Sequence, residues 1–176
     1  MEEELSSCAG GHVLPHSDLT ETVRGAFVIS CDVLFEHFDR NYPMMASSET
    51  NAFQLHGLGP VYGSDRGRIV FYLYTTTGKG PHGRGTGQCR SRQKLQPNTW
   101  HHVQVTKTAR TLTVQVDGES NSVQLPDEMD NGDFVMRETG SIVLMDGAKP
   151  DHFLHGKMKN FKISAPSRPK SAYSVR

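Results

Sequence analysis

The stretch from Pro97 to Leu125, PNTWHHVQVTKTARTLTVQVDGESNSVQL, decides the fold. Apolar and polar residues alternate in it, and successive side chains of a strand point to opposite faces of a sheet. The residues of buried parity are His101, Val103, Val105, Leu112, Val114 and Val116. Residues 107–110 suit a hairpin connection, and Asp117-Gly118 is a second turn signal because glycine accepts positive φ. Since the alternation restarts at Val123, the stretch predicts an antiparallel meander of three strands.

Two motifs resemble parts of laminin G-like domains, which belong to the concanavalin A-like jelly rolls. The first, at residues 100–118, is W-H-x-V-x-V followed by a turn and then L-x-V-x-V-D-G. The second, at residues 153–164, is F-x-x-G-x-M-x-N-F-x-I-S. The second is similar to the strand that closes those domains. The resemblance implies an all-β fold, a two-sheet antiparallel jelly-roll sandwich, and says little about activity because one sandwich hosts many functions. Lys157 stands where many secreted members have a cysteine.

Size and charge narrow the class of protein. A chain of 176 residues fits one domain, and its 17 glycines together with recurrent alternation favour β structure. Lys+Arg and Asp+Glu both number 19, so net charge points to neither nucleic acid nor a membrane surface. No apolar run reaches the roughly 18 residues of a membrane helix. The sequence predicts no oligomeric state.

The cysteines and the N-terminus bear on the compartment. Cys8, Cys31 and Cys89 form no disulfide framework, and Cys31 shares the parity of apolar neighbours, which predicts a buried thiol. A Cys8–Cys89 bridge is the alternative. The acidic start is unlike a secretory signal. We expect a cytoplasmic protein if Met1 is the native start, and an extracellular one if the chain is an excised domain.

Three segments are predicted along the chain: an N-terminal arm at 1–24, the laminin G-like domain at 25–164 and a flexible basic tail at 165–176. Further strands are expected at 25–38, 52–56, 68–75, 134–136 and 141–145, with loops at 39–50 and 78–87. Met158 and Phe161 differ in parity, so a bulge near Asn160 is needed for both to face inward.

The candidate ligand-binding residues lie on the expected strands around residues 54 and 72. One sheet of a jelly roll curves, and its outer concave face is the usual ligand platform. Aromatic rings stack on the apolar faces of sugars, while amide and imidazole groups bind hydroxyls, so a converging set of such residues is a saccharide surface. The predicted set is Gln54, His56, Arg68, Tyr72, Tyr74 and Arg84. Ordinary solvent-facing strand residues are the alternative interpretation.

Phe53-Gln54-Leu55-His56-Gly57 also resembles the Gln-x-His strand of several β-jelly-roll polysaccharide lyases. The resemblance implies that Gln54 would neutralise a uronate, His56 would act as base and Tyr72 or Tyr74 as acid. The arginine-rich strand and the tyrosine-rich closing motif of those lyases are missing, and the chain is short for them. An enzyme is therefore the less favoured alternative.

The best metal candidate is the acidic turn at 127–133, where Asp130 and Asp133 would be calcium ligands. Its spacing does not match the calcium loop of helix–loop–helix proteins, so we expect a solvated turn and no cofactor. For zinc, His101 and His102 point to opposite faces of a strand, and His152-x-x-His155 lacks a partnering pair.

These observations favour a non-catalytic binding module that recognises a glycan or a protein partner through one face or rim of a jelly roll. A polysaccharide lyase acting on uronate-containing polymers is one alternative. The other is an intracellular interaction or scaffold domain. The identity of the ligand is not predicted.

Overall fold

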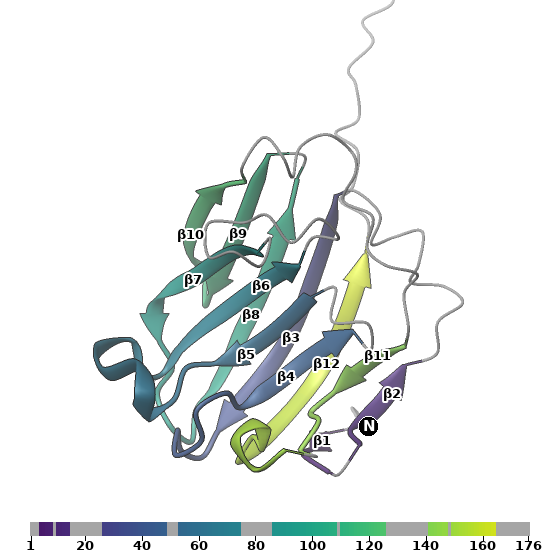
Figure 1. Cartoon of the computed structure of the whole chain (residues 1–176), viewed down its shortest axis with the longest axis vertical. Coiled ribbons are helices and arrows are strands. Elements are labelled where there is room, and N and C mark those ends of the chain that lie inside the picture. The colour runs from purple at the N-terminus through teal and green to yellow at the C-terminus, as the bar shows by residue number, and fades with distance from the viewer. Residues whose placement is uncertain are drawn as a thin grey trace, which may run out of the picture.

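The chain folds, in a computed structural model, into two antiparallel sheets that lie face to face (Figure 1). The structure describes residues 4–8, 10–14, 26–48, 53–74, 86–108, 110–125, 141–147 and 149–164. In these residues helix is limited to two 3₁₀ segments, η2 (Pro60–Asp65) and η4 (Pro150–His152). Neither has the length and apolar character that crossing a membrane as a helix requires.

Each sheet has six strands in the described part of the chain. The first sheet contains β1 (Leu5–Ser6), β3 (Phe27–Phe35), β8 (Trp100–Lys107), β9 (Thr111–Val116), β10 (Glu119–Gln124) and β12 (Gly156–Ser164). The second contains β2 (His12–Leu14), β4 (Met44–Ser48), β5 (Phe53–Gly57), β6 (Arg68–Tyr74), β7 (Thr86–Lys94) and β11 (Ile142–Leu144). The strand orders are β1-β12-β3-β8-β9-β10 and β2-β11-β4-β5-β6-β7. This architecture confirms the predicted all-β sandwich.

The predicted meander is confirmed. β8, β9 and β10 pair antiparallel in chain order, and Val105 lies opposite Val114 across the β8–β9 pair. Asp117 (φ 47°) and Gly118 (φ 88°) form the turn between β9 and β10. Both have positive φ, as the tightest hairpin turns with the right-handed strand twist require.

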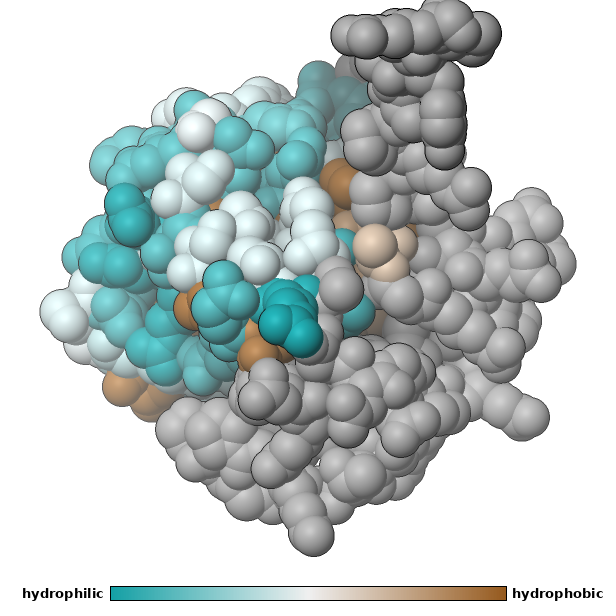
Figure 2. Space-filling view, turned by 90° about the horizontal axis from the view of Figure 1, so that it is seen from above, coloured by the Kyte–Doolittle hydropathy of each residue, from teal (hydrophilic) through white to brown (hydrophobic). Residues whose placement is uncertain are grey.

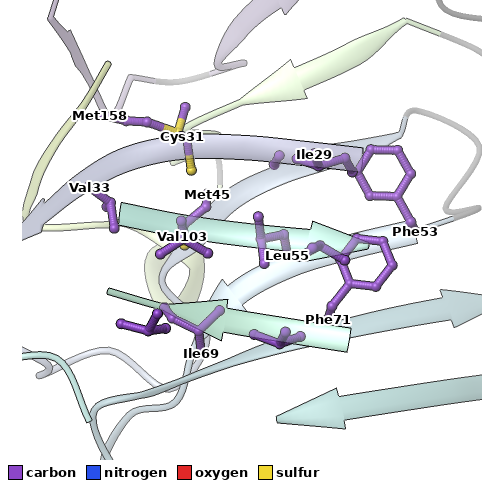
Figure 3. Close-up of a cluster of buried hydrophobic side chains, with 14 of the residues drawn as sticks. Ile29, Cys31, Val33, Met45, Phe53, Leu55, Ile69, Phe71, Val103 and Met158 are labelled. Carbon is purple, nitrogen blue, oxygen red and sulfur yellow. The ribbon is translucent and has the colours of Figure 1, made fainter. Parts of the chain in front are cut away.

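The core lies between the two sheets and takes side chains of one parity from each (Figure 3). The first sheet contributes Ile29, Cys31, Val33, Val103, Val105, Val114 and Met158; the second contributes Met45, Phe53, Leu55, Ile69, Phe71 and Leu73. The rings of Phe53 and Phe71 stack with centroids 5.6 Å apart. Since these residues face inward, their neighbours along β5 and β6 have to face outward.

His101 is the hydrogen-bonded core histidine that the parity predicts. Its Nδ1 contacts Oδ2 of Asp117 at 2.6 Å, and its Nε2 accepts the Gln96 amide at 2.9 Å. Burial alone would raise the pKa of Asp117, but hydrogen bonds from His101, from the His102 amide and from Gln93 outweigh it and lower that pKa. The turn after β9 is thus tied to β8 by side chains as well as by backbone.

The bulge predicted near Asn160 is present. The pairing of β12 with β3 shifts register between Lys159 and Lys162, and Asn160 has φ 55°. The extra residue lets Met158 lie in the core while Phe161 packs partly buried against it.

The cysteines agree with the prediction of a buried thiol. Cys31 is fully buried, and burial raises the pKa of its thiol to about 12, with the Asp32 charge adding to the effect. The alternative bridge does not form, because Cys8 and Cys89 are both free.

Three expectations about secondary structure are wrong. Residues 44–48 form a buried strand where a loop is predicted, because β4 pairs with β5 and β11 on its two sides. Residues 86–94 form β7, with Gly87 within it. The predicted arm, residues 1–24, contributes β1 and β2, which pair with β12 and β11. The domain therefore begins earlier than residue 25.

Other predictions fall outside the described residues. They concern the loop at 78–85, the acidic turn at 127–133 with Asp130 and Asp133, the strand at 134–136 and the basic tail at 165–176.

Candidate ligand-binding face

Four of the predicted site residues lie together on the outer face of the second sheet. Gln54 and His56 belong to β5, and Tyr72 and Tyr74 belong to β6. The two strands pair antiparallel with Gln54 opposite Tyr72. Since Phe53 and its inward neighbours fill the core, the alternation of the strands puts the four polar and aromatic side chains on the other side.

Direct contacts join these four residues. The ring of Tyr72 stacks on His56 with centroids 5.3 Å apart and an angle of 16° between the planes. Tyr72 and Tyr74 are also stacked, at 6.2 Å and 24°. The hydroxyl of Tyr74 donates a hydrogen bond of 2.9 Å to Oε1 of Gln54. The rings form an ordered series along the sheet, with the amide fixed beside it.

Loops from the end of the sandwich extend this series. Tyr42 contacts His56, Tyr62 of η2 and His152 of η4, with ring centroids 5.6, 5.7 and 6.3 Å apart. Burial raises the pKa of Tyr62, and its hydrogen bonds with Tyr42 and Tyr72 raise it further. We call the connected set the aromatic row. Its members are Tyr42, His56, Tyr62, Tyr72, Tyr74 and His152.

Within the aromatic row, His56 is only 2% exposed. Its Nδ1 lies 2.9 Å from the carbonyl oxygen of Gly57, which requires a proton on Nδ1. Burial is the main reason that the pKa of His56 is lowered to about 4, so the ring is neutral at physiological pH. A base in polysaccharide β-elimination has to reach a carbon-bound proton of the polymer. This imidazole is covered on its own sheet, which disfavours the lyase alternative.

His56 should make the stability of the domain depend on pH. In the unfolded chain its pKa returns to about 6.5, so between pH 6.5 and 4 the unfolded state binds a proton that the folded state does not. Stability is therefore complete above pH 6.5 and falls as the pH decreases toward 4. The loss attributable to this group is about 3 kcal/mol. Urea denaturation at several pH values across this window measures it.

The matched variant for that experiment is His56→Gln, which keeps a polar group and removes the titration. We expect the free energy of unfolding of this variant to change less between pH 6.5 and 4 than that of the unchanged protein. Parallel pH profiles for the two proteins would show that His56 is not buried as a neutral ring.

The predicted binding set contains two arginines, Arg68 and Arg84, and the structure describes the first of them. Arg68 lies at the opposite end of β6 from Tyr74, about 20 Å away along the strand. Its Nε is 3.3 Å from Asp65, and its Nη1 donates to the carbonyl of Ser91. Arg68 thus shares the outer face of β6 with Tyr72 and Tyr74 but lies at its far end, next to η2. Arg84 lies outside the described residues.

A different arginine contacts the aromatic row. The guanidinium of Arg90, on β7, lies 5.9 Å from the ring centroid of Tyr62 and bonds Asp65 at 2.6 Å. Sequence reasoning missed Arg90, because the basic run that contains it carries no apolar alternation. It also missed Tyr42 and Tyr62, which come from loop and 3₁₀ segments. The glycines around Tyr62 were the one local signal of an ordered turn.

Comparison with known proteins identifies the family. Residues 72–160, just over half of the chain, match the sequence model of the Laminin G domain. No curated protein sequence matches the chain.

Solved structures with the same fold include domains LG4-5 of the mouse laminin alpha1 chain, with a TM-score of 0.58, 13% identity, and coverage of 93% of this chain and 41% of that one. The binding domain of botulinum neurotoxin DC in complex with rat synaptotagmin II has a TM-score of 0.60, 11% identity, and coverage of 93% and 43%. A structure of botulinum neurotoxin type C has a TM-score of 0.58 and 12% identity, with coverage of 93% of this chain and 43% of that one. The cell entry of this toxin is described as dependent upon interaction with two ganglioside molecules.

This chain thus spans less than half the length of these structures. At such low identity the likeness concerns the fold. The fold agrees with the sequence match, and the chain belongs to the laminin G domain family.

Proposed function

We propose that this domain is a non-catalytic module that binds a glycan through the outer face of its second sheet. The observation that carries the proposal is the aromatic row, in which Tyr72 and Tyr74 lie stacked and half-buried beside the Gln54 amide. Tyrosine is also favoured in strands for packing alone, so the proposal depends on the series of rings together with the amide fixed beside it. A sugar needs such rings for its C–H faces and amide groups for its hydroxyls.

The electrostatics of the face fit a polar ligand. His56 is neutral, and Asp65 lies between Arg68 and Arg90 at 3.3 and 2.6 Å. The phenol of Tyr62, whose pKa is raised, stays protonated and uncharged. The face thus offers donors, acceptors and aromatic surface close to overall neutrality. This combination suits a neutral or weakly acidic saccharide.

The described part of the surface has few exposed large hydrophobic side chains. In the described residues the exposed large hydrophobic side chains are Val13, Tyr42 and Val61, two of which accompany the aromatic row. Figure 2 looks onto the end of the molecule that is uppermost in Figure 1, where the described surface is mainly hydrophilic or neutral. Obligate protein interfaces are more apolar than the described surface at this end, whereas transient protein interfaces are not.

Two of the structural neighbours are described with ligands, one with a glycan-bearing lipid and one with a protein. One neurotoxin is described as interacting with ganglioside molecules, which carry glycans, and another is in complex with synaptotagmin. These ligands are those of the whole neurotoxin chains, of which the match covers 43%. The row of rings on the present chain favours the glycan.

Replacement of Tyr72 by alanine should weaken glycan binding about fivefold, because it removes one stacking contact worth about 1 kcal/mol. The measurement is a glycan array, with and without calcium, followed by titration calorimetry with the best glycan. Trp100→Ala is the matched control, since Trp100 is a half-buried aromatic residue on β8 of the other sheet. The Trp100→Ala variant should bind the glycan with the same affinity as the unchanged protein.

Three experimental outcomes would contradict non-catalytic glycan binding by this face. Equal weakening by Trp100→Ala would show that the face is not the site. Formation of unsaturated uronides from acidic polysaccharides, measured by ultraviolet absorption and lost in His56→Ala, would establish the lyase alternative. Absence of binding to every glycan would leave the interaction domain as the account that fits.

A further inference from the structure

A cluster of metal-ligating side chains lies where β3 ends and β12 begins, and Figure 1 shows these two strand ends at its lower edge. It consists of His37 and Asp39, which follow β3, and His155, which immediately precedes β12. One donor atom from each residue lies within 4.8 Å of the other two. The sequence offers His152-x-x-His155 no partnering pair of zinc ligands; the structure brings His37 and Asp39 close to His155 from a distant part of the chain.

The backbone holds the two segments in place. The amide of Glu36 donates to the carbonyl of His155 at 2.8 Å, and the amide of Tyr42 donates to Asp151 at 2.9 Å. These bonds lie on either side of the cluster along the loop. The ring of Phe153 packs against His155 with centroids 4.8 Å apart. The ligand-bearing segments are thus ordered by contacts that do not depend on the cluster.

One nitrogen in the cluster lacks a partner that its burial demands. Nε2 of His155 is inaccessible to solvent and has no hydrogen-bond partner among the described residues. It points toward Asp39, with Oδ2 at 3.6 Å, beyond hydrogen-bond range. An unsatisfied buried polar atom costs free energy, and a bound cation would satisfy it.

We infer that His37, Asp39 and His155 bind a zinc ion. Zinc is bound at about 2.0–2.1 Å by imidazole nitrogen and about 2.0–2.2 Å by carboxylate oxygen, in tetrahedral geometry, which places neighbouring ligand atoms about 3.4 Å apart. The separations from Asp39 are 3.3 Å to Nδ1 of His37 and 3.6 Å to Nε2 of His155. The first separation ends at Oδ1 and the second at Oδ2, so each imidazole nitrogen lies at about the required distance from one of the two carboxylate oxygens. A small rotation of the Asp39 carboxylate is needed to present one oxygen to both nitrogens.

The two imidazole donor atoms lie within 4.8 Å of each other, so zinc binding requires His37 to rotate toward His155. The His37 side chain is half exposed, and its ring meets that of His155 edge-on at a centroid distance of 4.3 Å. The same exposure gives the ion a route from solvent. Calcium is a poor fit, because it takes about six to eight oxygen ligands and no imidazole.

Arg40 carries a positive charge next to the Asp39 carboxylate and therefore competes with zinc for it. Its Nε lies 3.8 Å from Oδ2 of Asp39 and, within the described residues, also has no hydrogen-bond partner. The side chain is 41% exposed, so it can turn into solvent when the carboxylate binds the ion. Removal of this charge should therefore increase the affinity for zinc.

Three protein ligands leave the fourth tetrahedral position for water or for a ligand atom from outside the domain. The loop that carries His37 and Asp39 continues to Tyr42 of the aromatic row. Bound zinc would clamp this loop to the start of β12 and so restrain Tyr42. This inference does not depend on glycan binding.

The test is zinc titration of the untagged protein by calorimetry, together with thermal unfolding with and without the ion. We expect one zinc per chain and a melting temperature that rises by several degrees, because the ion binds the folded state. Calcium should give neither effect. Cobalt in place of zinc should give the intense visible absorption of a four-coordinate site.

Variants assign the ligands. His37→Ala, His155→Ala and Asp39→Asn should each weaken zinc binding about tenfold or more, since even the outer partners of metal ligands contribute about that much. Arg40→Ala should strengthen it severalfold. His102→Ala is the matched control, because His102 and Asp32 form a similar pair at 2.7 Å outside the cluster.

The outcomes are distinct. No zinc binding by the unchanged protein, or binding that survives His37→Ala and His155→Ala, would overturn the inference and leave the cluster as a set of ion pairs. Loss of zinc binding in His102→Ala alone would place the ion elsewhere. Glycan binding without zinc binding, or the reverse, separates this inference from the proposed function.

Discussion

Val114→Asp should unfold the domain at room temperature. Val114 is fully buried on β9, opposite Val105 of β8, and its strand is paired on both sides, with β8 and β10. An unpaired carboxylate in this position costs several kcal/mol against a total stability of roughly 5–15 kcal/mol. Circular dichroism and urea denaturation measure the loss directly.

Thr113→Asp, one residue away, is the matched control. Thr113 lies on the outer side of the same strand, where its hydroxyl contacts that of Ser122 at 2.8 Å. The carboxylate remains in solvent there, so the variant should lose about 1 kcal/mol. Similar losses in the two variants would contradict the assignment of inner and outer faces on which the whole fold rests.

Gly59→Ala should be nearly as damaging, for a steric reason. Gly59 precedes η2, and its amide donates to the carbonyl of Asn41 at 3.1 Å. An added methyl group would overlap the backbone carbonyl of Arg40, which cannot rotate away as a side chain would. The loop that carries Tyr42 would be pushed off η2. We expect a loss of about 3 kcal/mol in thermal or urea unfolding, together with weaker glycan binding.

Gly57→Ala tests whether backbone contact is the cause. Neither glycine is in the left-handed region, and the methyl group at Gly57 would meet side-chain atoms of Phe35 and Pro43 at 3.1 Å. Those rings can move by a few tenths of an ångström, so the cost should be about 1 kcal/mol. A Gly59 variant no less stable than the Gly57 variant would contradict the close packing of the loop against η2.

The parity of side chains predicts much of this fold. The meander, the long strand β3, the aromatic strand β6 and the bulge at Asn160 all follow from local alternation and turn residues. Parity within β5 and within β6 also predicts which of their side chains face away from the core, Gln54 and Tyr72 among them. Local pattern is sufficient there because each strand has an apolar side and a polar side.

The strands that sequence reasoning missed lack that contrast. β7 turns Gly87, Cys89 and Ser91 toward the inside, and such small residues give no apolar alternation. β4 is buried over most of its length and is preceded by Asn41 and Pro43, which are loop signals. Both strands are specified by neighbours on either side in the sheet, and a single sequence does not reveal these.

In the candidate sites, too, some features follow from the local sequence pattern and others from contacts between distant segments. Alternation brings Tyr72 and Tyr74 to one face, but the buried His56 is also contacted by Tyr42, which comes from a separate loop. The cluster of His37 and His155 depends on the antiparallel pairing of β3 with β12. Contacts between segments far apart in the chain determine these features, so residue spacing does not predict them.

The most direct test of glycan binding by the outer face is a nuclear magnetic resonance titration of the labelled domain with the best glycan from the array. The account predicts that the largest shift changes occur at Gln54, Tyr72 and Tyr74, with saturation at one glycan per chain. Signals of Trp100 and Thr113, on the other sheet, should not move. Shift changes concentrated on that other sheet, or absent from the aromatic row, would contradict the account.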